Sequence, residues 1–277
     1  MPAVVVSADR RLRPMRLALA LEYDGRGFCG FQSQSSRCGV QDALEDALRA
    51  IAQRDVVAIP AGRTDAGVHA TSQIVHADVP DERPLTAWVR GVNAHLPSSV
   101  AVLWAHPVPE AFHARFAATG RHYDYLLLAR PERPGLLSGR VGWYHRPLDA
   151  GAMREAAALV TGRHDFSAFR AAECQAKSPV KTLRRFDVDA EGDLLRFSLS
   201  ADAFLHHMVR NLVGALVTIG AGKAAPNWMR ELLDARDRTR GPATFAPDGL
   251  YFAGADYDAS FGLPPTRRPV VLAAPSA

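Results

Sequence analysis

The order of hydrophobic patterns along the chain is the feature that most limits its fold. Apolar residues in the first half either alternate with small or polar ones, as in strands, or recur at helical spacing. The predicted strands are 15–24, 55–60, 75–79 and 100–108, and the predicted helices are 40–51 and 85–96. This order, β-α-β-β-α-β, is the ferredoxin-like arrangement, whose sheet is antiparallel.

The second half repeats this order with additions. Its predicted strands are 123–128, 183–189, 194–200 and one from 249, and its predicted helices are 152–160, 205–219 and 228–235. We therefore expect an α+β fold of two ferredoxin-like βαββαβ halves, whose antiparallel sheets face a central cleft. The expected divisions are a flexible basic arm (1–14), the two halves (15–113 and 114–263) and a loose, proline-broken tail (264–277).

The basic residues are almost all arginine. Only Lys177, Lys181 and Lys223 among the 33 basic residues are lysine. Arginine binds phosphate and stacks on bases, which favours a nucleic-acid partner. A GC-rich genome would produce the same excess, so both explanations stay open at this point.

Cysteine content and hydropathy exclude several classes of protein. The three cysteines cannot all pair, and none lies in a Cys-x-x-Cys zinc or redox pattern. The longest apolar run, 212–221, is shorter than the roughly 20 residues that a membrane span needs. We expect a cytoplasmic protein with reduced cysteines, no membrane segment and no bound metal.

A glycine-flanked loop carries the first chemically informative group, Asp65. The loop reads GRTDAGVHA over residues 62–70, between two predicted strands. The simplest explanation of Asp-Ala-Gly is a turn in which the aspartate bonds its own backbone. His69, just beyond that turn, is expected to make a local hydrogen bond rather than to titrate in catalysis.

The segment 204–211, FLHHMVRN, carries the second chemically informative group. On a helix, His206 and Arg210 share one face, whereas His206 and His207 diverge by about 100° and would not share a metal ion. A charged arginine in an apolar helix needs a carboxylate partner, and Asp65 is the candidate.

Aromatic and basic residues alternate in a third region, at 112–116 and 121–125. Such residues provide base stacking and phosphate contacts together. Tyr123 is the candidate stacking residue, although a strand with one aromatic face would show the same pattern.

Two other functions remain possible from the residues alone. One is a metal-dependent hydrolase built on Asp65, His69 and His76, for which a further ligand set is missing. The other is a non-catalytic RNA-binding module, in which Asp65 serves only the turn.

Six segments, in order, resemble motifs of the bacterial tRNA pseudouridine synthase A family, and the likeness extends from about residue 15 to 257. They are LEYDG (21–25), GRTDAGVHA (62–70), VNAHLP (92–97), FHARF (112–116), DFSAFR (165–170) and HHMVRN (206–211). Ser72 stands where members often have glycine, and Asp124 where a basic residue is common.

The resemblance implies an isomerase that converts uridine to pseudouridine at positions 38, 39 and 40 of the tRNA anticodon stem-loop. It implies a homodimer that binds tRNA, needs no cofactor and acts on a flipped-out base. Asp65 matches the nucleophile and Arg210 the arginine paired with it. Tyr123 matches the tyrosine that stacks on the base, and Arg63 an arginine that helps to admit it.

Overall fold

The computed structural model describes residues 14–80 and 83–271. The predicted basic arm lies outside these residues except for Pro14, as does the end of the predicted tail. Within the described residues, no helix has the length and hydrophobicity to cross a membrane.

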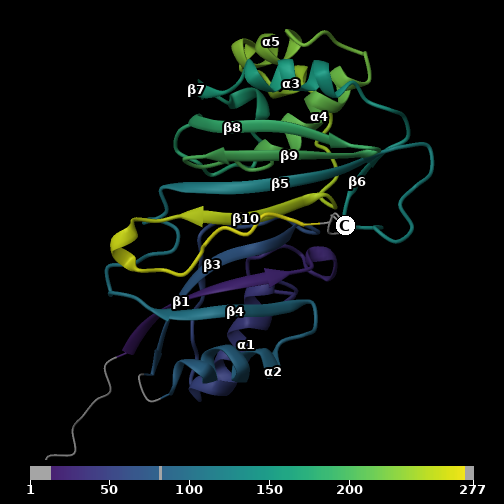
Figure 1. The fold of residues 1–277 in the computed structure, drawn as a ribbon. Helices are drawn as coiled ribbons and strands as arrows, with labels where there is room; N and C mark the ends of the chain where they lie inside the picture. The colour runs from purple at the N-terminus through teal and green to yellow at the C-terminus, as the bar shows by residue number, and fades with distance from the viewer. Residues whose placement is uncertain (1–13, 81–82, 272–277) are drawn as a thin grey trace, which may run out of the picture.

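The first half has the predicted β-α-β-β-α-β order (Figure 1). Its elements are β1 (Pro14–Tyr23), α1 (Val40–Ala52), β2 (Ile59–Pro60), β3 (His69–Pro80), η2 (Ala87–Gly91) continued by α2 (Val92–His95), and β4 (Val100–Pro107). Gly39 caps helix α1, and its N–H donates to the Asp42 carboxylate at 2.9 Å, which is one half of a capping box. Its apolar stripe, which includes Leu44 and Leu48, is buried.

The second half has the same connectivity with added strands and a helix. Its elements are β5 (Gly120–Ala129), β6 (Gly142–Tyr144), α3 (Ala150–Ala158), β7 (Gly162–Asp165), β8 (Val180–Glu191), β9 (Leu194–Ala201), α4 (Met208–Gly220), α5 (Trp228–Ala235) and β10 (Leu250–Asp256). Helix α4 begins at Met208, three residues later than the sequence predicts.

The two halves share one ten-stranded, mostly antiparallel sheet in the order β4-β1-β3-β10-β5-β9-β8-β7, with β2 on β3 and β6 on β5. The expectation of two separate sheets that face each other is therefore wrong. Strand β10 pairs with β5 and also, in parallel, with β3 at Tyr251–His69 and Phe252–Ala70. An edge strand has unpaired backbone groups, and here each half satisfies those of the other.

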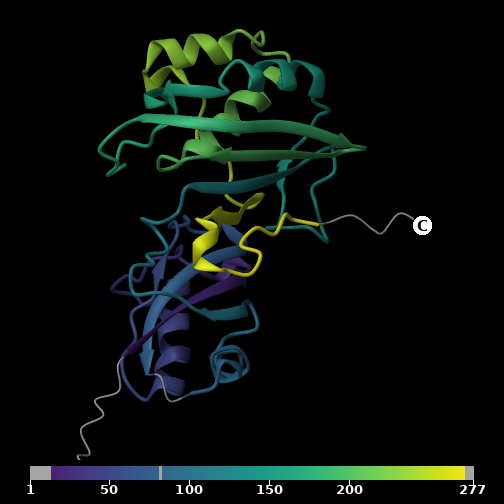
Figure 2. The same ribbon diagram turned by 60° about the vertical axis from the view of Figure 1, so that its left-hand side comes forward.

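The shared sheet twists strongly between the halves. Figure 2 shows the strands of the second half running across the view and those of the first half running steeply. Each half keeps its own core, one around Trp88 and Phe112 against α1 and α2, the other around Phe166 and Phe197 against α3, α4 and α5.

The described part of the predicted loose tail, 264–271, is docked on the sheet. Arg267 forms a β-bridge with Gly254, whose φ of +138° and closeness to the Thr266 carbonyl leave no room for a side chain. The Ser72 hydroxyl donates to the Thr266 carbonyl at 2.9 Å, and the buried Asp124 carboxylate accepts from the Val270 N–H at 3.0 Å. Ser72 and Asp124, which depart from the motifs that the sequence resembles, therefore both anchor the tail.

The cysteines differ from the expectation of three reduced thiols. Cys29 and Cys38 form a disulfide, with their Cα atoms 5.4 Å apart, and Cys174 is free and buried.

Candidate active site

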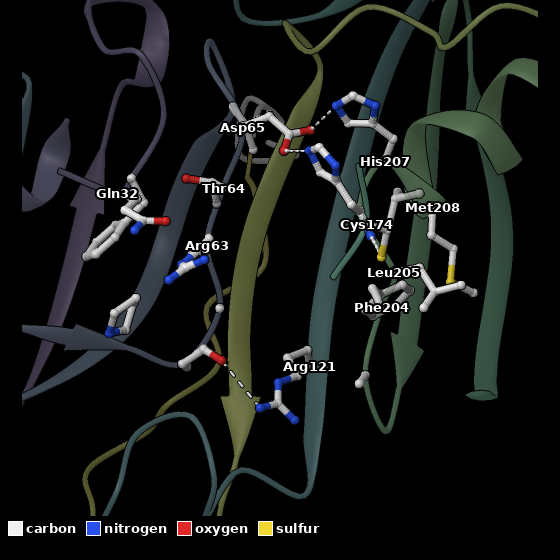
Figure 3. A pocket seen from close by; sticks show the side chains of 18 of the residues that line it. Gln32, Arg63, Thr64, Asp65, Arg121, Cys174, Phe204, Leu205, His207 and Met208 are labelled. Atoms are coloured by element: carbon white, nitrogen blue, oxygen red, sulfur yellow. Dashed lines mark hydrogen bonds and ion pairs between the residues drawn. The ribbon is translucent and has the colours of Figure 1, made fainter. Parts of the chain in front are cut away.

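A cleft of about 980 Å³ lies where the halves meet. The loop 58–66 lines it from the first half, and 173–176 and 203–210 line it from the second (Figure 3). All four predicted site residues line this cleft: Arg63, Asp65, Tyr123 and Arg210.

The loop that carries Asp65 is held by neighbouring strands. The Thr64 hydroxyl lies 2.8 Å from the Tyr23 hydroxyl of β1, and its carbonyl accepts from the Phe31 N–H. The Gln73 side chain of β3 donates to the Gly62 carbonyl at 2.7 Å. With the backbone fixed on both sides of it, Asp65 has a defined position at the cleft wall.

The Asp65 turn leaves the carboxylate available. The turn is closed by the Asp65 main-chain carbonyl, which accepts from Val68 N–H at 3.1 Å, and by Gly67 with φ +79°. The carboxylate itself points across the cleft, so the turn does not use the Asp65 side chain as the simplest explanation required.

Arg210 is the predicted partner, and the structure brings the two residues together. Its Nη1 lies 3.1 Å from Asp65 Oδ2, while its Nε donates to the Phe245 carbonyl at 2.7 Å. The side chains of Asp65 and Arg210 are 23% and 14% exposed, so this ion pair is largely shielded from water. Arg210 belongs to the first turn of α4, whose positive end also favours an anion.

Two histidines that the sequence did not assign to Asp65 contact it as well. His206 Nε2 lies 3.2 Å from Oδ1, and His207 Nε2 lies 3.3 Å from Oδ2. Figure 3 shows His207 reaching the Asp65 carboxylate from the second half.

The prediction that these two histidines diverge is wrong, because neither lies in helix α4. Helix α4 begins at Met208, directly after His207, and His207 adopts a left-handed conformation (φ 60°, ψ 3°). That backbone turns the two rings toward the same side, with centroids 3.9 Å apart. The sequence does not predict a left-handed conformation at a histidine, since this conformation is uncommon for residues other than glycine.

Tyr123 lies half-buried between two aromatic side chains. Its ring meets those of Phe204 and Phe252 edge to face, with centroids 5.0 and 5.2 Å apart. Burial and the nearby charge of Asp65 raise the pKa of Tyr123 well above its usual value. The hydroxyl is therefore protonated at neutral pH, and the ring is fixed beside the carboxylate.

Positive charge in the cleft comes from both halves. Arg63 is exposed, and Figure 3 shows its guanidinium turned away from Asp65. Arg121, which the sequence did not single out, donates to the carbonyls of Asp202 at 2.9 Å and Ala61 at 3.3 Å and so bridges the halves. Burial lowers the pKa of Arg121 from its usual high value.

His69, at the end of the loop, bonds backbone groups as expected, but those groups are distant in sequence rather than local. His69 Nδ1 accepts from the Gly25 N–H at 3.1 Å, and Nε2 lies 2.9 Å from the Gly139 carbonyl. His76 Nδ1 accepts from Ala114 N–H at 3.1 Å. With both histidines bound to backbone groups elsewhere, the Asp65–His69–His76 metal site is not assembled.

A different group could hold a cation. Within residues 14–80 and 83–271, the ligand atoms of Asp65, His206 and His207 lie within 4.8 Å of one another. The Arg210 guanidinium already bonds the same carboxylate, and its positive charge opposes a metal ion there. The geometry favours a carboxylate paired with Arg210, with two imidazole nitrogens within 3.3 Å of it.

This chain is similar to a family model and to a solved structure. A family model described as tRNA pseudouridine synthase matches residues 19–117 and 156–258. Among solved structures, a chain of an archaeal box H/ACA sRNP complex is similar over 73% of this chain and 43% of that chain, at 10% identity and a TM-score of 0.34.

Curated relatives match over nearly their full length. The chain is 60% identical over 250 residues to tRNA pseudouridine synthase A of Thiobacillus denitrificans, covering 90% of this chain and 96% of the relative. It is 61% identical over 251 residues to that of Chromobacterium violaceum, with coverage of 90% and 96%. It is 53% identical over 253 residues to that of Burkholderia mallei, with coverage of 91% and 94%.

Proposed function

Because this chain belongs to the tRNA pseudouridine synthase family, we propose that it converts uridine to pseudouridine at positions 38, 39 and 40 of the tRNA anticodon stem-loop. The chain is an isomerase that acts on tRNA. The observation that supports the proposed site is the Asp65 carboxylate, held by Arg210 and two histidines beside Tyr123 in a cleft between the halves.

The reaction breaks the N1–C1′ bond of uridine, turns the uracil and joins C5 to C1′. The C5 proton is lost and N1 gains one, so the product is an isomer and neither oxidant nor cofactor is consumed. Asp65 is the proposed nucleophile, and attack at C1′, addition to the ring and removal of a sugar proton are all compatible with its position. Arg210 balances its charge where both side chains are largely shielded from water.

The base must leave the helix stack to reach Asp65, at a cost of a few kcal/mol. Tyr123 is proposed to stack on the extruded uracil, since its ring is already oriented by two aromatic neighbours. Arg63, exposed at the cleft wall, is proposed to help admit the base. Arg121 adds a second positive charge near the junction of the halves.

The assembly and location of the protein are also proposals. We infer a cytoplasmic homodimer that binds one tRNA across both subunits, with 15–113 and 114–263 as its two halves and 1–14 as a basic arm. The support is the family membership, since the match covers 90% of this chain and 96% of two bacterial relatives.

The decisive experiment uses unmodified tRNA with tritium at uridine C5. Purified protein is expected to release tritium to water and to leave pseudouridine in the anticodon arm, with release unchanged by a chelator. Binding of tRNA without any release would instead favour the non-catalytic RNA-binding module, and release lost on chelation would favour metal chemistry.

A further inference from the structure

Three aromatic rings form a column that ends at the protein surface near the cleft. The ring of His76 is buried and lies 4.6 Å, centroid to centroid, from that of His113. The ring of His113 in turn stacks on that of Phe116 at 4.2 Å and 30°. Phe116 is 76% exposed, so most of the last ring of the column is accessible to solvent.

This exposure is built into the backbone. His113 Nδ1 accepts from the N–H groups of Arg115 and Phe116, both at 3.2 Å, and the His113 carbonyl accepts from Ala117 N–H at 2.9 Å. The turn is therefore capped by the same imidazole that supports Phe116. The backbone of this turn therefore presents the Phe116 ring to solvent.

The chemistry around Phe116 matches a nucleotide. Arg115 lines the active-site cleft, and its guanidinium carbon lies 5.8 Å from the Phe116 ring centre. Burial lowers the pKa of both His76 and His113, to about 4 for His76, so the column is a neutral aromatic stack at neutral pH. An aromatic face beside an arginine is the usual combination for binding one base and its phosphate.

We propose that the exposed ring of Phe116 stacks on an unpaired base of the tRNA that flanks the target uridine, and that Arg115 binds its phosphate. The proposal rests on the proposed function and adds a subsite to it. Tyr123 holds the uridine that reacts, whereas Phe116 holds a neighbour in place at the cleft rim. Stacking there would stabilise the opened strand while the target base is in the cleft.

The test places the fluorescent base 2-aminopurine at each nucleotide flanking the target uridine in an anticodon stem-loop RNA. Addition of wild-type protein is expected to change the fluorescence at one of these positions, and Phe116→Ala to abolish that change. Phe116→Ala is expected to weaken RNA binding roughly 5- to 150-fold, since base stacking on an aromatic contributes about 1–3 kcal/mol. Phe116→Trp should restore both signals.

The matched control is Leu136→Ala, because Leu136 is 96% exposed and does not line the cleft. It should leave binding and fluorescence unchanged. Equal binding by Phe116→Ala and Leu136→Ala, or fluorescence unaffected by Phe116→Ala, would overturn the subsite. So would a smaller sedimentation coefficient of RNA-free Phe116→Ala, which would assign Phe116 to a contact between two copies of the chain. Tritium release by wild type in the same preparation keeps failure of the subsite distinct from failure of the proposed function.

Discussion

Arg210 Nη1 lies 3.1 Å from Asp65 Oδ2, although 145 residues separate the two in sequence. The contact joins a loop of the first half to the first turn of α4 in the second half. The cleft chemistry therefore depends on the correct relative placement of both halves.

Asp65→Asn should abolish tritium release while leaving tRNA binding within a few-fold of wild type. Asparagine keeps the size and the Asp65 main-chain turn, but it lacks the negative charge and the nucleophilic oxygen. Release and affinity are measured on one preparation, with Asp234→Asn on the exposed face of α5 as the control. Turnover by Asp65→Asn near the wild-type rate would reduce the loop to a structural role.

Arg210→Ala should lower both turnover and the free energy of unfolding. It leaves a largely shielded carboxylate without its cation and frees the Phe245 carbonyl, at a cost of about 1–3 kcal/mol. Arg210→Lys should also slow turnover, since an ammonium cannot reproduce the two-sided guanidinium contact. Urea unfolding of Arg210→Ala is compared with that of Arg230→Ala. The control removes the exposed Arg230–Asp234 ion pair, which contributes about 0–1 kcal/mol. Equal effects of the two alanine variants would contradict a special role for the Asp65 pair.

Tyr123 substitutions separate stacking from chemistry. Tyr123→Phe keeps the edge-to-face contacts with Phe204 and Phe252, so RNA binding should be retained while single-turnover release slows. Tyr123→Ala should impair both, with binding weakened roughly 5- to 150-fold. A fully active Tyr123→Phe would mean that the hydroxyl has no part in the chemistry.

Metal removal should leave the reaction rate unchanged. Although Asp65, His206 and His207 are close enough to hold an ion, the Arg210 guanidinium occupies the same carboxylate. Release is measured after dialysis against a chelator and again after addition of Zn²⁺. Loss on chelation with recovery on Zn²⁺ would show that the cluster is a working metal site.

The stability of the protein should fall between pH 6.5 and 4 because of His76. Burial lowers its folded pKa to about 4, so over this window the unfolded chain binds a proton that the folded chain does not. His76 thus contributes a loss of roughly 3 kcal/mol as the pH falls from about 6.5 to about 4. His76→Asn, whose amide oxygen can accept from Ala114 N–H, should show a shallower pH dependence in urea unfolding. Parallel curves for the two proteins would refute this assignment.

Much of the fold follows from local sequence. The β-α-β-β-α-β order of each half is readable because side chains of a strand alternate every two residues and those of a helix every 3.6. The Asp65–Arg210 pair is predictable as well, since a charged arginine in an apolar helix requires a carboxylate, and the loop at 62–70 offers one.

The tertiary structure alone decided how these parts meet. The joining of both halves through β10 and β3, and the docking of Val270 on Asp124, depend on which distant backbone groups are left unpaired. The left-handed backbone at His207 brings both histidines to Asp65, and local conformational preference does not predict it. Periodicity reports which face of an element is apolar, but partners across the sheet and uncommon backbone conformations are set by long-range packing, which a local pattern does not contain.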